Sequence, residues 1–273
     1  AVIGHFNSGC SLPASEVYHQ AGIVQITPAS TNPQVTERGF NQTFRLCGRD
    51  DQQGDVSAKF AFDSLELSKV AVIHNKTAYG QGIAEVFRKT FEAKGGNVSL
   101  FDGLASEEMD FRATISAIQK SGAQAVFFGG MYNQGGPFYN QLRQAGFKGA
   151  FLGGDGIYDG ELIKTVGAKA DSVFITFGPD FMATESAKPF LAAYKAKFGQ
   201  DAGGYAIYGY DAANILLEAI QKAGTTDADK VSQTLRSQSW KGLTGDAEFD
   251  AKGDLKKANY VIWTIREGAF AVR

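Results

Sequence analysis

Four segments of the sequence concentrate side chains that could bind a charged small molecule. Residues 6–15 and 27–33 are rich in Ser, Thr and small residues, so hydroxyl and backbone N–H groups could converge there on an anion without any arginine. Residues 74–82 contain a tyrosine, and residues 153–156 hold Asp155 among three glycines, where a carboxylate would suit an ammonium group. Each segment alone also suits an ordinary turn or helix cap. Their combination predicts a pocket for a zwitterion.

Signatures of enzyme chemistry are missing from the same sequence. It contains no GxSxG, Walker A, HExxH or CxxC motif. The three histidines, His5, His19 and His74, are expected to have structural roles, because a metal site usually needs several ligands. Residues 80–82 read Gly-Gln-Gly like the start of a dinucleotide loop, but Glu85 stands at the third glycine position. We therefore expect a protein that is not an enzyme and that has no cofactor or metal.

Composition narrows the class of partner. The 273 residues include 27 Lys and Arg against 29 Asp and Glu, so the net charge of −2 does not favour nucleic acid as a partner. No apolar run approaches the roughly 18 residues that a membrane-spanning helix needs. Glycine is frequent, with 33 residues, which suits a fold with many tight turns between strands and helices.

The elements that must position these loops alternate along the chain. Short β-branched or aromatic runs are separated by amphipathic helical stretches, a pattern typical of βαβ units and parallel sheets, so the fold class is α/β. The end of the chain alternates again around residues 267–268 and predicts a hairpin of 258–265 with 268–272. Strands are expected at about 1–6, 23–27, 43–47, 69–74, 97–101, 125–129, 149–153 and 172–176. Helices are expected at about 51–65, 80–93, 187–198, 205–223 and 227–237.

The loops also carry motifs that resemble a known family. The chain is similar over essentially its whole length to the leucine/isoleucine/valine-binding proteins, periplasmic receptors of amino-acid ABC importers with the two-lobed type I fold. The resemblance implies no enzymatic activity, a periplasmic location and a membrane permease of an ABC transporter as partner. The matching runs are Val2-Ile3-Gly4-His5, Pro13-Ala14-Ser15, Ile26 to Pro33 (ITPASTNP), Tyr79-Gly80-Gln81-Gly82, Gly129-Gly130 and Phe249 to Asp254 (FDAKGD).

The resemblance implies a set of ligand contacts from the first lobe. Ser8 and Thr31 would hold the carboxylate of an amino acid through their hydroxyl and backbone N–H groups, and Ala29 would offer its carbonyl to the ammonium. Phe6 and Tyr205 would line the space for the ligand side chain.

The second lobe would supply the remaining contacts. By the same resemblance Asp155 would accept from the ammonium, Gly156 would border it, and Tyr79 would close over the ligand. Asp155 stands where the branched-chain receptors have Glu, and Met131 stands where they have a pocket Tyr. The shorter acid draws the carboxylate back by roughly 1.5 Å, about one C–C bond. γ-Aminobutyrate or a compact amino acid is therefore expected to bind at least as well as leucine.

Domain limits also follow from the family likeness. It implies two doubly wound lobes joined by three crossings, with residues 1–50 and 179–254 in the first lobe and 51–178 and 255–273 in the second. The family's first βαβ units have no counterpart here, so we expect a missing N-terminal segment, possibly supplied by another chain, without which the first lobe is unstable. A ligand-sensing receptor or regulator domain of the same fold is the alternative function, and a Rossmann-like enzyme is the least favoured one.

The two cysteines leave two alternatives open. In the periplasm a disulfide between Cys10 and Cys47 could persist, since both are expected in the first lobe. Two free thiols are the other outcome.

Overall fold

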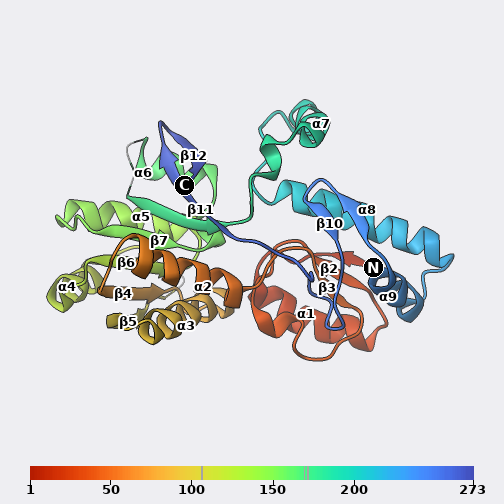
Figure 1. The fold of residues 1–273 in the computed structure, drawn as a ribbon, viewed down its shortest axis with the longest axis horizontal. Helices are drawn as coiled ribbons and strands as arrows, with labels where there is room; N and C mark the ends of the chain where they lie inside the picture. Colours follow the sequence, from red (N-terminus) through yellow and green to blue (C-terminus); the bar gives the residue numbers. More distant parts are fainter. Residues whose placement is uncertain (106, 169, 171) are drawn as a thin grey trace. The chain divides into compact units, whose positions relative to one another are not determined.

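The fold was analysed in a computed structural model, which describes residues 1–105, 107–168, 170 and 172–273. The chain forms two compact units, shown as a ribbon in Figure 1. Unit 1 comprises Ala1–Arg49 and Gly178–Asn259, and unit 2 comprises Asp50–Phe177 and Tyr260–Arg273. The chain therefore passes between the units three times, after residues 49, 177 and 259.

Unit 1 is built on a short parallel sheet in the order β1-β2-β3. The strands β2 and β3 are buried along their whole length, and Ile26 lies opposite Phe44. Both residues belong to a core that includes Trp240 and Phe249, against which helices α8 and α9 pack their apolar faces. The strands and helices of unit 1 are β1 (Val2–Ile3), α1 (Ser8–Gln20), β2 (Gln25–Thr27), β3 (Thr43–Arg45), α7 (Lys188–Phe198), α8 (Ala206–Ala223), α9 (Ala228–Ser237), β9 (Trp240–Gly242) and β10 (Gly245–Ala247).

Unit 2 contains a larger sheet in the order β12-β11-β8-β7-β6-β4-β5. The strands from β8 to β5 are parallel, and β11 and β12 add to the β8 edge in antiparallel fashion. Its elements are α2 (Asp50–Lys59), β4 (Lys69–His74), α3 (Ala78–Ala93), β5 (Asn97–Gly103), α4 (Arg112–Ser121), β6 (Ala125–Gly129), α5 (Tyr132–Gln144), β7 (Ala150–Gly153), α6 (Gly160–Val166), β8 (Val173–Phe177), β11 (Val261–Arg266) and β12 (Ala269–Val272).

Both faces of the central strands of this sheet are covered, as parallel strands require. On β6, Phe127 stacks on Phe87 of α3 with ring centroids 4.1 Å apart. The next residue, Phe128, points to the opposite face and contacts Phe138 of α5. This alternation explains why β6 reads as a continuous apolar run in the sequence.

All but two of the elements with an expected range agree with the structure to within a few residues, and helices α1, α4, α5 and α6 have no expected range. The strand expected at 1–6 has only Val2–Ile3, because His5 already turns toward the first helix and its N–H donates to Ser11 Oγ. The helix expected at 51–65 ends at Lys59 and continues as a π-helical turn over Phe60–Ser64. The short antiparallel pair of β9 and β10 was not expected at all.

The third passage between the units lies later than the residue 254 expected from family likeness. The segment after Asp254 is still bonded to unit 1, since Lys256 N donates to the carbonyl of Glu248 at 2.8 Å. The expectation of a further N-terminal segment is not tested by this structure and stays a prediction.

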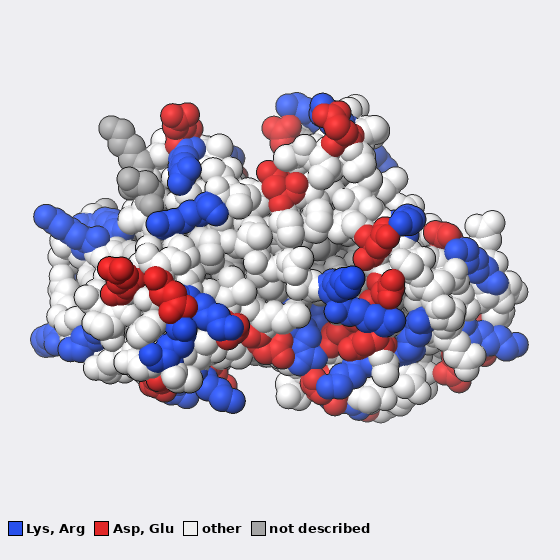
Figure 2. All heavy atoms as spheres, viewed as in Figure 1, with Lys and Arg blue, Asp and Glu red and all other residues white. Residues whose placement is uncertain are grey.

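Three further properties bear on function. Neither cysteine forms a disulfide, and Cys10 is exposed whereas Cys47 is buried. Among the described residues no helix is long and apolar enough to cross a membrane, and no cluster of His, Cys, Asp and Glu could hold a metal ion. Figure 2 shows acidic and basic side chains intermingled over the visible face of each unit.

Candidate functional site

The residues expected to bind an anion lie in unit 1, where two loops meet. Ser8 is the first residue of α1, and Thr31 follows β2; both side chains are almost fully buried. The loops are joined directly, because Asn32 N donates to Ser8 Oγ at 3.2 Å. Within the described part of the chain, the buried hydroxyl of Thr31 has no hydrogen-bond partner. A buried hydroxyl without a partner is costly, so its position here is consistent with a ligand contact.

The loop that carries Thr31 is held in shape by its own hydroxyl groups. Thr27 Oγ1 accepts from the backbone N–H of Ser30 at 2.9 Å and donates to the carbonyl of His5 at 2.7 Å. Ser30 Oγ bonds to Ser11 Oγ of α1 at 2.7 Å. These bonds explain why the ITPASTNP run is rich in hydroxyls: Thr27 and Ser30 fix the loop, which leaves Thr31 for other contacts.

Three other expected site residues also lie in unit 1. Phe6 is about half exposed, and its ring meets that of Tyr205 edge-to-face with centroids 5.1 Å apart. Tyr205 stands at the start of α8 and also contacts Tyr208. Ala29 is buried beside Thr27, whose hydroxyl lies 3.3 Å from its N–H. The aromatic pair expected to line the side-chain space is therefore brought together.

The residues expected to bind an ammonium group lie at the carboxyl ends of parallel strands in unit 2. Asp155 follows β7 and begins a short 3₁₀ turn, Asp155–Ile157, and it is 4% exposed. Tyr79 follows β4 and Met131 follows β6. Because the chain moves from β5 to the far side of β4 to form β6, the strand order reverses between β4 and β6, and β7 pairs with β6. Open α/β sheets bind ligands at such a point.

Tyr79 is hydrogen-bonded to Asp155 and to the residue that follows it. Its hydroxyl donates to Asp155 Oδ1 at 2.8 Å and accepts from the backbone N–H of Gly156 at 2.8 Å. Burial, followed by the negative charges of Asp155 and Asp50, holds the pKa of Tyr79 well above its ordinary value. The phenol therefore stays protonated and keeps donating. The expected closure of Tyr79 over a ligand stays a prediction.

Gly156 has no room for a side chain. A Cβ there would lie 2.6 Å from the carbonyl oxygen of Gly130 and 2.7 Å from Cε1 of Tyr79. The same crowding explains the nearby glycine motifs, because a Cβ on Gly80 or Gly129 would collide with the backbone carbonyl of the other. These glycines let α3 approach β6 closely enough to place Tyr79 beside Asp155.

Two residues that the sequence analysis missed complete the support of Asp155. Gln53 of α2 donates from Nε2 to Asp155 Oδ1 at 2.7 Å, and its Oε1 accepts from the Asp155 backbone N–H at 2.5 Å. Thr176 of β8 donates to the same Oε1 at 3.0 Å, which fixes the orientation of the amide. No local motif marks Gln53, although a glutamine at a fully buried position of a helix is a signal in itself.

Met131 has a partly structural role. Its side chain is partly buried against the core cluster that includes Phe127 of β6. Its carbonyl accepts from the N–H groups of Gln134 and Gly135 at the start of α5. The residue thus lies just after the end of β6, and part of its surface remains accessible. Its contact with a ligand stays a prediction.

Comparison with known proteins identifies the family of the chain. A family model described as periplasmic binding protein matches residues 1–269. The chain belongs to the periplasmic binding protein family. Its fold is the type I periplasmic binding fold, a mixed α/β architecture dominated by parallel strands.

Three similar proteins illustrate the relationship. An amino acid binding protein of Pseudomonas aeruginosa is 42% identical over 96% of this chain and 71% of its own length. The Leu/Ile/Val-binding protein homolog 1 of Brucella abortus is 40% identical over 98% of this chain and 72% of its own length. The crystal structure of a leucine binding protein, LivK, of Thermotoga maritima superimposes with a TM-score of 0.92 at 31% identity, covering 100% of this chain and 78% of the other. The relatives of this periplasmic binding protein are solute-binding proteins, so the prediction of a non-enzyme is confirmed.

Proposed function

We propose that this chain is the solute-binding protein of an ABC importer and captures a small amino acid. The two halves of the site carry opposite chemistry, and this observation supports the proposal most directly. Unit 1 offers buried neutral donors around Thr31, and unit 2 offers the buried carboxylate of Asp155. A zwitterion would satisfy both halves at once, with its carboxylate on unit 1 and its ammonium on unit 2.

The mode of capture follows from the family. The ligand would bridge the two units, which would close on it like a hinge and then present it to a membrane permease in the periplasm. Phe6 and Tyr205 would limit the room for the ligand side chain, and Ala29 would contribute its carbonyl to the ammonium.

The identity of the amino acid is the finer part of the proposal. The names of the Brucella and Thermotoga proteins point to branched-chain ligands for those proteins. In this chain the acid is Asp155, one methylene shorter than Glu, and its carboxylate is hydrogen-bonded to Gln53 and Tyr79. A ligand whose charged groups lie further apart suits that arrangement, so we propose that γ-aminobutyrate, or a compact amino acid such as proline, alanine or valine, binds at least as well as leucine.

Calorimetric titration with each of these amino acids tests the proposal, with the Asp155→Asn variant as the control for the site. Replacing the carboxylate by an amide of the same shape leaves the ammonium without its counter-charge and should cost on the order of 2–5 kcal/mol of binding free energy. Tight leucine binding without measurable γ-aminobutyrate binding would refute the ligand assignment. An unaltered affinity in Asp155→Asn would refute the site.

A further inference from the structure

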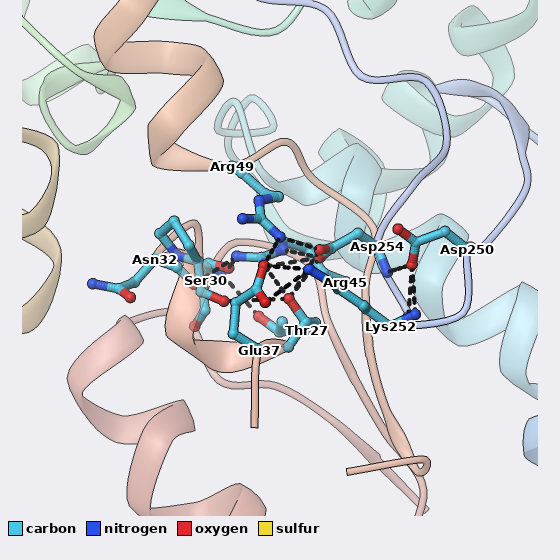
Figure 3. A network of polar contacts seen from close by, with 12 residues as sticks. Thr27, Ser30, Asn32, Glu37, Arg45, Arg49, Asp250, Lys252 and Asp254 are labelled. Atoms are coloured by element: carbon cyan, nitrogen blue, oxygen red, sulfur yellow. Dashed lines mark hydrogen bonds and ion pairs between the residues drawn. The ribbon is translucent and has the colours of Figure 1, made fainter. Parts of the chain in front are cut away.

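Next to the loop of Thr31 in unit 1 lies a fully buried arginine, Arg45, whose three guanidinium nitrogens all donate hydrogen bonds. Arg45, the last residue of β3, donates from Nε to Asp254 Oδ1 at 2.8 Å and from Nη2 to Thr36 Oγ1 at 2.6 Å. Its Nη2 also forms an ion pair with Asp254 Oδ1 at 2.8 Å. Its Nη1 donates to the carbonyls of Ser30 at 3.0 Å and Asn32 at 2.8 Å. These contacts engage all three nitrogens of the guanidinium, and Figure 3 shows those with Ser30, Asn32 and Asp254.

The two carbonyls belong to the loop that is expected to bind the ligand carboxylate. The carbonyl of Ser30 and the N–H of Thr31 are the two ends of one peptide group. Arg45 therefore binds the acceptor end of the peptide whose donor end is expected to face the ligand. Among the described residues, neither the N–H nor the hydroxyl of Thr31 has a partner.

We propose that Arg45 is a positioning residue for the carboxylate of the ligand and acts through the Ser30–Thr31 peptide. This inference rests on the proposed function, since it assumes that a carboxylate binds at Thr31. A hydrogen bond from a cation to a carbonyl polarises the peptide, and hydrogen bonds in such a chain strengthen one another in a medium of low dielectric constant. The N–H of Thr31 becomes a stronger donor, and its direction is fixed before the ligand arrives.

The arrangement accounts for an anion site built from neutral groups. The guanidinium of Arg45 is fully buried, so it would act on the ligand only through the peptide group. Its positive charge is balanced by the carboxylate of Asp254. Asp254 is itself held by the hydroxyl of Thr36, at 2.9 Å from each carboxylate oxygen, and by Arg49 Nη1 at 2.7 Å. A lysine at position 45 would keep the charge but could not bond the two carbonyls, Thr36 and Asp254 together, because it has three donors on one atom.

The variant Arg45→Lys tests the inference, with Lys252→Gln as its charge control. Lys252 lies in the same network but is exposed and bonds to Glu37 at 2.8 Å. We expect Arg45→Lys to weaken amino-acid binding by about tenfold or more, the loss expected for a charge-assisted hydrogen bond. Its Thr31 amide proton resonance in the ligand-free protein should move upfield. Lys252→Gln should leave both quantities close to those of the wild type.

A second variant tests the role of Arg45 even if Arg45→Lys does not fold. Replacing the Ser30–Thr31 peptide by an ester removes the N–H through which Arg45 is proposed to act, so it should weaken binding by a similar factor. Combined with Thr36→Val, which removes one of the bonds to Arg45, the ester should lose less than the sum of the two single losses.

The outcomes separate this inference from the proposed function. If the wild type binds no amino acid in calorimetry, the proposed function is wrong. If the wild type binds but Arg45→Lys has normal affinity and an unmoved Thr31 resonance, only the role of Arg45 is wrong. An additive effect of the ester and Thr36→Val would also contradict it.

Discussion

The phenol of Tyr79 and the carboxylate of Asp155 are joined by a hydrogen bond of 2.8 Å, although 76 residues separate them in the sequence. The same phenol oxygen accepts the N–H of Gly156, so one side chain fixes both the acid and the turn that carries it. Gln53 adds two further bonds to Asp155. The carboxylate is thus held in one orientation by protein groups alone, which would reduce the ordering cost of binding a ligand there.

Removal of the Tyr79 hydroxyl should therefore weaken ligand binding. In Tyr79→Phe, Asp155 Oδ1 and the N–H of Gly156 each lose a partner, and we expect amino-acid affinity to fall by about tenfold, the effect of one bond to a charged group. Calorimetry measures the change. Tyr139→Phe is a matched control, because Tyr139 is equally buried in unit 2. Equal losses in the two variants would contradict a specific role for Tyr79.

Gly156 permits a second test of the same turn. In Gly156→Ala the new Cβ would displace either the Tyr79 ring or the carbonyl of Gly130, so we expect weaker binding together with a lower melting temperature. Gly160, at the start of α6, has open space around its Cα. Gly160→Ala should leave affinity unchanged and stability equal or slightly higher. Thermal denaturation with and without ligand distinguishes the two variants, and a Gly156→Ala protein with wild-type affinity would contradict the role of this turn.

Thr31 should be sensitive to the loss of its hydroxyl but not of its methyl group. Thr31→Val keeps the shape of the side chain and removes its hydroxyl oxygen, which has no hydrogen-bond partner among the described residues. Without a ligand, this variant should be as stable as the wild type or more stable, because a buried polar group is replaced by an apolar one. Its amino-acid affinity should fall by several-fold to tenfold, whereas Thr31→Ser should retain most of the binding. A Val variant that binds normally would remove Thr31 from the site.

The sequence predicted those parts of the fold that depend on local patterns. The continuous apolar run of β6 reflects a strand buried on both faces, and the 3.6-residue period of α3 reflects a helix with one buried face, so these patterns located both elements to within a few residues. The strand-end position of Asp155 followed from the glycines around it. Motif resemblance then supplied candidate contacts, which a single sequence could not derive from spacing.

The supporting residues could not be predicted because their partners are distant in the chain. Gln53 reaches Asp155 across 102 positions, and Arg45 reaches Asp254 across 209. Nothing local to either residue specifies such a pairing. The signal that was available is a charged residue inside a short apolar strand, since Arg45 lies directly between Phe44 and Leu46. A buried guanidinium requires a counter-charge and several acceptors, so that pattern predicts a network without identifying its members.

The Arg45–Asp254 pair should make the stability of unit 1 depend on acid pH. Burial by itself would raise the pKa of Asp254, but the charge of Arg45 and the hydrogen bonds from Arg49, Arg45 and Thr36 outweigh it, and the pKa is lowered. A carboxyl whose pKa is lower in the folded state contributes stability that is complete above its unfolded pKa, about 4, and that is lost as the pH falls through the folded value.

Asp254→Asn abolishes this titration and leaves the Arg45 charge without its nearest partner. We therefore expect Asp254→Asn to be destabilised by about 3–5 kcal/mol at pH 7, as for a broken buried pair, and the gap to the wild type to narrow below about pH 4. Urea denaturation from pH 7 to pH 3 measures the gap, with Asp246→Asn, which breaks an exposed ion pair to Lys241, as a control that should change little. A gap that stays constant over this range would show that the Asp254 charge does not stabilise the fold.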